Sequence, residues 1–362
     1  MLDLSAFLPG PLAGLLLADM GAEVLKIEPP AGDPMATLGP RDAEGGAVFY
    51  EAVNAGKRVR RMNLKEDDVR AEFLRMVVDF DVLIEGFRPG VMARLGLGYP
   101  VLQAVNPGLI LCSLSGYGAE GPRVREAGHD ANYLAGSGVM HRNGNPPTFY
   151  DPPIADVSGS LFAVIAILGA LRAREADGRG CAVDIGLADT PMPLQLFEIA
   201  GHGATGSVPQ ANETYLNGGA AYYQVYGTSD GRHVALGAIE PKFWAAFCHA
   251  AGRPDWVARQ SEAEPQLGLI GEVAALIGSL TLADCVARFT PADCCFSPVL
   301  DLGEALASPH HRERGLVRPA ADGALQALFP ARIDGAAPAS RPKLSRLHEE
   351  AGKPWPTTSN LA

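Results

Sequence analysis

The chain has 362 residues, of which 47% are hydrophobic and 20% are charged, and its formal net charge is −11. This length exceeds the usual size of one domain, so we expect two. So acidic a chain is a poor candidate for binding nucleic acid over a broad face, although a local basic cluster can still hold a small polyanion. The six cysteines show no CxxC spacing, which favours a reduced, cytoplasmic protein without a structural metal site.

The N-terminal stretch predicts a β-α-β unit. Residues 2–4 are typical of the end of a strand, a Gly/Pro turn precedes an apolar helix over 12–18, and a second strand covers 24–28. Because no positively charged segment precedes the apolar run and Asp19 ends it, we expect neither a signal peptide nor a membrane span. The start inside a strand suggests that residues upstream of Met1 are missing.

Positive charge gathers between residues 54 and 94. Lys57, Arg58 and Lys65 lie in a dense basic run, while Arg88 and Arg94 follow a predicted strand over 81–85. A charge run is usually a solvated face. However, Arg and Lys suit phosphate oxygens, and ligands of open α/β sheets bind at the carboxyl ends of strands. We therefore expect these five residues to hold phosphate groups.

Residues 116–121 (GYGAEG) match the dinucleotide-binding pattern GxGxxG after a predicted strand over 109–114. The residues that follow, 122–126, carry no apolar face for the required helix. We interpret the match as a Gly-rich active-site loop and not as a nicotinamide site.

The longest apolar run, 161–171, predicts a buried helix that is covered on all sides. We expect Asp156 at its N-cap, where first-turn amides and the helix dipole favour negative charge. Gly128, His129 and Asp130 lie upstream as a second polar cluster. A capping aspartate is usually only structural, so a catalytic role for Asp156 needs further support.

A smaller second domain is expected after the polar passage 201–217. Residues 222–228 and 233–239 predict a hairpin with an Asp-Gly turn. Pro241 then opens a helix, which places Glu240 at its N-cap; here too, the simplest role is structural. The tail over 336–362 is predicted to be an irregular strap.

Motifs along nearly the whole chain resemble the family III CoA transferases (the CaiB/BaiF family), in the branch that contains α-methylacyl-CoA racemase. They are LDLSAFLPGPLAGLLLADMGAEVLKIEPPAGD, NAGKR, NLK, DVLIEGFRPGVMARLGLGY, SGYGAEGP, GHDANY, IADVSGS, NGGAAYYQVYGTSDGR and GAIEPKFW. One departure is the basic sequence over 59–62 after NAGKR, which puts that edge of a CoA site in doubt.

The resemblance implies an α/β fold with a large Rossmann-like, CoA-binding domain (1–200), a smaller α+β domain (215–305) and a C-terminal segment (306–362) that returns to the large domain. It also implies an interlocked homodimer. In racemase members, His129 and Asp156 would be the two acid/base residues, supported by Glu240. In transferase members the residue at Asp156 is the covalent acyl acceptor.

The chemistry of racemisation fits these residues. A carbon α to a thioester is inverted when one group removes its proton and another returns a proton to the opposite face. Amides at the start of the helix of Asp156 would stabilise the enolate oxygen, and Gly128 and Asp130 would support the site. The acyl-CoA substrate brings its own activation, so we expect no cofactor beyond CoA and no metal, and neither a nucleic-acid nor a membrane partner.

Two alternatives stay open. A CoA transferase would use Asp156 as a nucleophile and form a mixed anhydride. An idle CoA-binding scaffold would have no need for His129, Asp156 and Glu240 together. The sequence does not identify the acyl group, although the racemase interpretation places the enzyme in fatty-acid and lipid metabolism.

Overall fold

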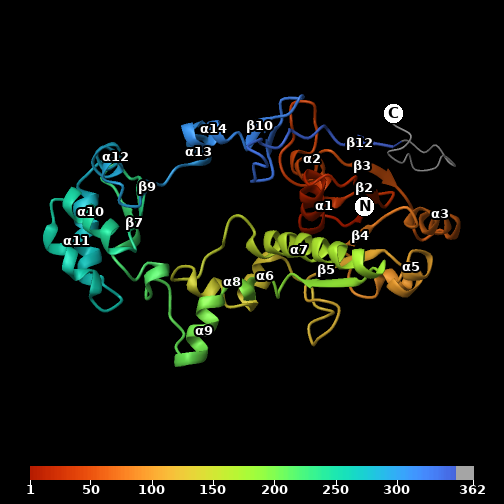
Figure 1. Cartoon of the computed structure of the whole chain (residues 1–362), viewed down its shortest axis with the longest axis horizontal. Helices are drawn as coiled ribbons and strands as arrows, with labels where there is room; N and C mark the ends of the chain where they lie inside the picture. Colours follow the sequence, from red (N-terminus) through yellow and green to blue (C-terminus); the bar gives the residue numbers. More distant parts are fainter. Residues whose placement is uncertain (348–362) are drawn as a thin grey trace. The chain divides into compact units, whose positions relative to one another are not determined.

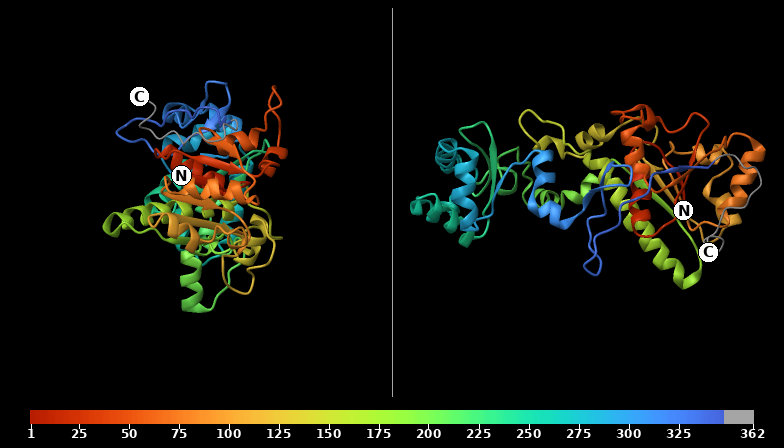
Figure 2. Two further views of the ribbon diagram at one scale, coloured as in Figure 1. Left: turned by 90° about the vertical axis from the view of Figure 1, so that its right-hand side faces the viewer. Right: turned by 90° about the horizontal axis from the view of Figure 1, so that it is seen from above.

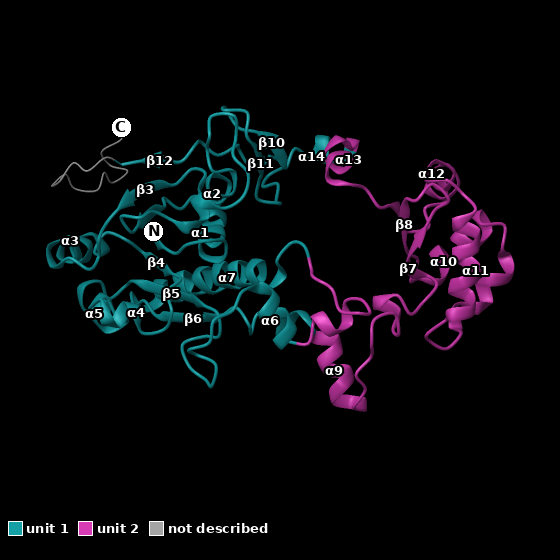
Figure 3. Ribbon diagram, turned by 180° about the vertical axis from the view of Figure 1, so that it is seen from behind, with its two compact units in different colours: residues 1–137, 151–195, 310–362 teal, residues 138–150, 196–309 magenta. Residues whose placement is uncertain are grey.

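The computed structural model describes residues 1–347, which form two compact units (Figure 3). Unit 1 comprises residues 1–137, 151–195 and the C-terminal segment from residue 310, and unit 2 comprises residues 138–150 and 196–309. The expected boundaries did not include the excursion of residues 138–150 into unit 2. The end of the predicted strap, from residue 348, lies outside the described residues.

Unit 1 is built on a seven-stranded parallel sheet with the order β12-β3-β2-β1-β4-β5-β6 (Figure 1). Its strands are β1 (Leu2–Leu4), β2 (Leu25–Glu28), β3 (Arg58–Arg61), β4 (Val82–Glu85), β5 (Ile110–Ser115), β6 (Ala182–Gly186) and β12 (Ser345–Arg346). The expected α/β class and the N-terminal β-α-β unit are confirmed. The strand order reverses at β1, which pairs with both β2 and β4. Such a switch point is where open α/β sheets bind ligands.

Helices pack on both faces of this sheet. The helices of unit 1 are α1 (Pro9–Asp19), α2 (Val48–Asn54), α3 (Asp67–Val77), α4 (Val91–Arg94), α5 (Tyr99–Val105), α6 (Asp130–Gly136), α7 (Ile154–Asp177), α8 (Pro191–Leu194) and α14 (Pro309–Arg314). In Figure 2, α1 and α7 lie on one face of the sheet, and α3 and α5 lie on the other. In β4, Leu83 packs with the α3 side whereas Val82 and Ile84 pack with the α1 side, as the alternation of side chains along a strand requires.

Helix α7 differs from its prediction in two ways. Its N-cap is Pro153, and Asp156 lies within the first turn. The helix is also not covered on all sides, because Leu161, Ile165 and Leu168 are 47%, 63% and 41% exposed on one stripe. The apolar run therefore has one face packed on α1, β5 and β6 and one open face. By length and composition alone, α7 could also cross a membrane.

Unit 2 contains a three-stranded antiparallel sheet and helices, which share one hydrophobic core. The strands are β7 (Tyr223–Gly227), β8 (His233–Gly237) and β9 (Phe296–Pro298), and the helices are α9 (Leu196–Thr205), α10 (Pro241–Ala250), α11 (Leu267–Gly278), α12 (Leu282–Phe289) and α13 (Leu302–Ala307). The β7–β8 pairing confirms the predicted hairpin. Trp244 and Trp256 are fully buried in the core of unit 2, where Trp244 Nε1 donates to the Trp256 carbonyl.

The C-terminal segment returns to unit 1 and is fastened there. It forms the hairpin β10 (Val317–Pro319) and β11 (Leu325–Ala327) and then adds β12 to the sheet beside β3. Arg341 forms a buried ion pair with Asp19 at the end of α1. Parallel pairing with residues 287 positions earlier explains why local sequence patterns predicted only an irregular strap.

Candidate active site

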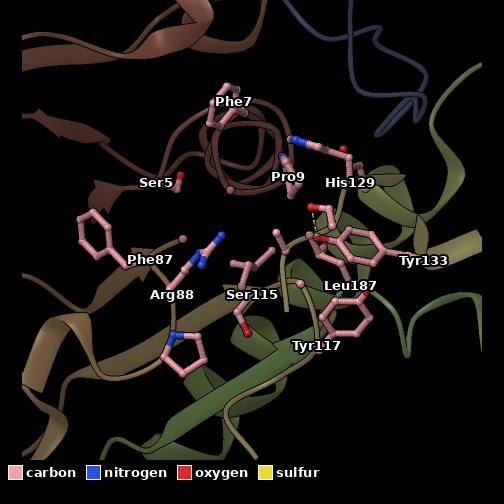
Figure 4. A pocket seen from close by; sticks show the side chains of 18 of the residues that line it. Ser5, Phe7, Pro9, Phe87, Arg88, Ser115, Tyr117, His129, Tyr133 and Leu187 are labelled. Carbon is pink, nitrogen blue, oxygen red and sulfur yellow. Dashed lines mark hydrogen bonds between the residues drawn. The ribbon is translucent and has the colours of Figure 1, made fainter. Parts of the chain in front are cut away.

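A cavity of about 440 Å³ lies in unit 1 at the carboxyl ends of β1, β4 and β5. It is lined by the turn after β1, the turn after β4, the Gly-rich loop after β5, and residues from α6 and α7 (Figure 4). Four of the predicted site residues line it: Arg88, Gly128, His129 and Asp156. The Gly-rich loop contributes Gly116 and Tyr117 to the lining, in agreement with an active-site loop.

His129 is held at the start of α6. Its backbone amide donates to Asn132 Oδ1 at 3.0 Å, which fixes the N-cap position. The preceding carbonyl, that of Gly128, accepts a hydrogen bond from Tyr133 Oη at 2.6 Å. Tyr133 is buried and packs edge-on against Tyr117 at 5.3 Å (Figure 4). The imidazole is exposed on a backbone that is anchored on both sides.

Asp156 is half-buried in the first turn of α7. Burial, and next the negative charge of Asp130, raise the pKa of its carboxyl to about 6, while the neighbouring His129 acts in the opposite direction. A carboxyl with this pKa can both hold and release a proton near neutral pH.

Asp130, in the first turn of α6, is bonded to the start of α7. Its Oδ1 atom accepts from the backbone amides of Ala155 at 2.7 Å and Asp156 at 3.2 Å. Asp130 therefore supplies the anion at the start of α7 that we had assigned to an N-cap Asp156. The same contacts limit a second expectation, because the Ala155 and Asp156 amides are bonded to Asp130 and are not available to stabilise an enolate oxygen.

The structure separates the five basic residues that we expected to hold phosphates. Arg88 lines the cavity, and Figure 4 shows its guanidinium pointing into it. Arg94 and Lys65 are exposed but do not line the cavity. Arg58 forms an ion pair with Glu23 at 2.8 Å.

Lys57 requires a correction. It is fully buried, and its ammonium donates to Asp3 Oδ2, the Pro11 carbonyl and Asn54 Oδ1 at 2.8–3.0 Å. All three protons of the ammonium are used, so Lys57 holds the fold together and has none left for a phosphate.

Glu240 lies in unit 2. It occupies the expected N-cap position of α10, but its side chain makes no capping hydrogen bond and is exposed. The carboxylate of Glu240 therefore does not cap α10, which was the simplest role expected for it. The support of His129 and Asp156 by Glu240 stays a prediction.

Among the cavity residues that sequence reasoning missed are Tyr133 and Phe7. Tyr133 follows His129 by four residues, so one helical turn after the predicted cluster was a usable signal. Phe7 could not be found in this way, because its role depends on a left-handed backbone conformation (φ 62°) that its sequence gives no reason to expect.

A doubly wound α/β unit with an imidazole and a carboxyl in a cavity at its switch point is typical of an enzyme that acts on a small-molecule ligand. The model of CoA-transferase family III matches residues 1–350, so the chain belongs to the family III CoA transferases. This confirms the resemblance shown by its motifs.

Relatives with two kinds of activity are similar to the chain. Alpha-methylacyl-CoA racemase of Homo sapiens is 32% identical over 320 residues, covering 87% of this chain and 80% of the relative. Succinyl-CoA:mesaconate CoA-transferase of Haloarcula marismortui is 32% identical over 346 residues, covering 89% and 85%. The crystal structure of a CaiB/BaiF family protein from Brucella suis superposes with a TM-score of 0.81 at 28% identity and covers 95% of this chain and 94% of that one.

Proposed function

We propose that the protein is an α-methylacyl-CoA racemase that moves a proton at the carbon α to a CoA thioester. The observation that carries the proposal is the presence of His129 and Asp156 in the lining of one cavity, with the Asp156 pKa raised to about 6. Racemisation needs two groups that can each accept and donate a proton, and these two side chains meet that requirement.

In the proposed reaction, one of the two side chains removes the α-proton and the other returns a proton to the opposite face. The roles are exchanged for the other epimer. Reaction in one direction leaves the two groups in the protonation states that the reverse reaction needs. Two groups with similar proton affinities therefore favour reaction in both directions. The burial of Asp156 and the charge of Asp130 raise the pKa of its carboxyl to about 6, so that it can both accept and donate a proton near neutral pH.

The CoA part would be held mainly by Arg88, the predicted phosphate ligand that points into the cavity. Arg94 and Lys65 remain candidates for phosphates that extend over the surface. The acyl-CoA substrate supplies the acidifying thioester, so the proposal requires no further cofactor.

The test is incubation of one epimer of 2-methyldecanoyl-CoA with the enzyme in heavy water. We expect deuterium at the α-carbon and conversion of either epimer to the same mixture. His129→Ala should abolish exchange but preserve CoA binding, as measured by calorimetry. Conversion without α-deuterium would contradict proton transfer at that carbon.

The second candidate is a CoA transferase, which is favoured by the transferase relatives at equal identity. Asp156 would attack the thioester carbon and form a mixed anhydride, with CoA leaving as the thiolate. The thiolate would attack the aspartyl carbonyl, which releases the donor acid and leaves an aspartyl-CoA thioester. The carboxylate of a second acid would displace CoA to form a second anhydride, and the thiolate would then attack its new acyl carbon and free Asp156. Hydroxylamine would trap this acyl-aspartyl species. Trapping on Asp156 together with an absence of α-deuterium would establish the transferase and exclude the racemase.

A further inference from the structure

Four buried charges lie beneath the turn between β1 and α1, which forms one wall of the cavity. They are Asp3, Lys26, Asp33 and Lys57, each no more than 4% exposed. Lys26 Nζ lies 3.0 Å from Asp33 Oδ2, and Lys57 Nζ lies 2.9 Å from Asp3 Oδ2. A buried ion pair contributes little net stability, because desolvation of both charges offsets their attraction. Two such pairs beneath one turn therefore call for another explanation.

The Lys26–Asp33 pair is bonded to the backbone of this turn. Lys26 Nζ donates to the Ser5 carbonyl at 2.7 Å, and Asp33 Oδ1 accepts from the Phe7 amide at 3.3 Å. Asp33 Oδ1 also accepts from the Met35 amide at 2.9 Å, which orients the carboxylate. The pair thus fixes the peptide groups on both sides of residue 6.

The Asp3–Lys57 pair holds the same turn at its two ends. Asp3 Oδ1 accepts from the Ser5 amide at 3.0 Å, and Lys57 Nζ donates to the Pro11 carbonyl at 2.8 Å. With the two bonds of the other pair, four backbone polar atoms between residues 5 and 11 are bonded to buried charges. This wall of the cavity is therefore held in one conformation.

Phe7 is the residue whose conformation this network forces. Its φ of 62° lies in the left-handed region, which a bulky side chain rarely adopts. Its ring does not relieve that strain by burial, because the residue is 41% exposed and lines the cavity. Figure 4 shows Phe7 on the same side of the cavity as His129, with Arg88 on the opposite side.

We propose that Phe7 is a ligand-contacting residue for the acyl chain, and that Lys26 and Asp33 are the positioning residues that hold its ring at the cavity. This inference rests on the proposed acyl-CoA substrate. The acyl chain is the expected partner because the ring is apolar and shares its side with the acid/base residue His129, whereas the cation that suits the phosphates of CoA lies opposite.

The test compares the affinities of 2-methyldecanoyl-CoA and isobutyryl-CoA, which share the thioester and CoA and differ in chain length. Phe7→Ala should weaken binding of the long thioester about tenfold through lost apolar contact, and binding of the short one by less than about twofold, as measured by calorimetry. Equal weakening of both, or no change in either, would overturn the contact with the chain.

Phe7→Gly separates a ligand contact from a structural role. Glycine adopts φ 62° without strain, so the thermal midpoint of the Phe7→Gly variant should be no lower than that of the wild type. Its affinity for the long-chain thioester should nevertheless fall as in Phe7→Ala. A midpoint several degrees lower would show that the ring is needed for packing and would contradict the proposal whether or not the protein binds thioesters.

Asp33→Asn tests the positioning pair. It should weaken long-chain binding, and in the Phe7→Ala background it should add no further loss, because the ring it positions is already absent. Additive losses would show that Asp33 acts by another route. If the wild-type protein binds neither thioester, the proposed function itself fails, an outcome that is distinct from equal weakening by Phe7→Ala.

Discussion

At the scale of single residues, the proposed chemistry involves two neighbouring aspartates with different surroundings. Asp130 accepts two backbone amides of α7, an arrangement suited to a carboxylate. Asp156 is half-buried beside that charge, and the pKa of its carboxyl is raised to about 6. It is therefore ionised above about pH 6 and protonated below, so a reaction that needs ionised Asp156 loses rate as the pH falls through 6.

Asp130→Asn should move the acidic limb of the pH–rate profile to lower pH by about one unit. The amide oxygen can still accept from Ala155 and Asp156, but the charge that raises the Asp156 pKa is gone, so Asp156 stays ionised in more acidic solution. The same shift is expected for a racemase or a transferase.

Asp184→Asn is the matched control, because Asp184 accepts the Ala119 amide at 2.8 Å and is not among the charges that shift the Asp156 pKa. It should leave the acidic limb in place. Asp130→Ala, which removes the acceptor as well, should lower the rate at every pH. An unshifted limb in Asp130→Asn would show that its charge does not set the protonation of Asp156.

At the scale of elements, the returning C-terminal segment is secured by one buried ion pair. The side chains of Arg341 and Asp19 are 8% and 5% exposed, and Arg341 Nε lies 2.6 Å from Asp19 Oδ1. Asp19 ends α1, where the helix dipole disfavours a negative charge, so the guanidinium offsets both that dipole and the burial.

Arg341→Met should lower the free energy of unfolding by about 3–5 kcal/mol, because it leaves the Asp19 carboxylate buried without a partner. Urea denaturation measures this loss. Lys343→Met is the control: its half-exposed ammonium lies 3.6 Å from Glu51, and its removal should cost about 1 kcal/mol or less. Equal effects of the two substitutions would contradict a special role for the buried pair.

At the scale of the whole molecule, we propose that the chain works as an interlocked homodimer, as its resemblance implies. The open stripe of Leu161, Ile165 and Leu168 on α7 is consistent with a further interface, since monomeric proteins rarely leave contiguous apolar faces uncovered. In such a dimer, Glu240 can belong to the site formed by His129 and Asp156 of the partner chain.

A hybrid dimer tests this arrangement. His129→Ala and Glu240→Ala homodimers should each be severely impaired, because each lacks one element in both sites. A co-expressed hybrid, purified through two different tags, would contain one doubly damaged site and one intact site. It should recover about half of the wild-type activity per dimer. A hybrid no more active than its parents would show that Glu240 serves its own chain or neither site.

Local patterns in the sequence predicted much of this protein. Alternating and continuous apolar runs indicated the parallel strands and the hairpin of unit 2, and the motifs around His129, Asp156 and Glu240 indicated the family. These features depend on neighbouring residues, so they can be predicted before the fold is known.

Only the tertiary structure decided how charged residues are used. Lys57 looked like a phosphate ligand, yet its ammonium is paired with Asp3, 54 residues away. The anion at the start of α7 is Asp130 and not Asp156, because a bond across 25 residues replaces a local cap. The backbone amide of Phe7 is bonded to Asp33, a carboxylate 26 residues further along the chain. A charge has the same sequence signature whether it is solvated, paired or bonded to backbone, and the fold alone supplies its partner.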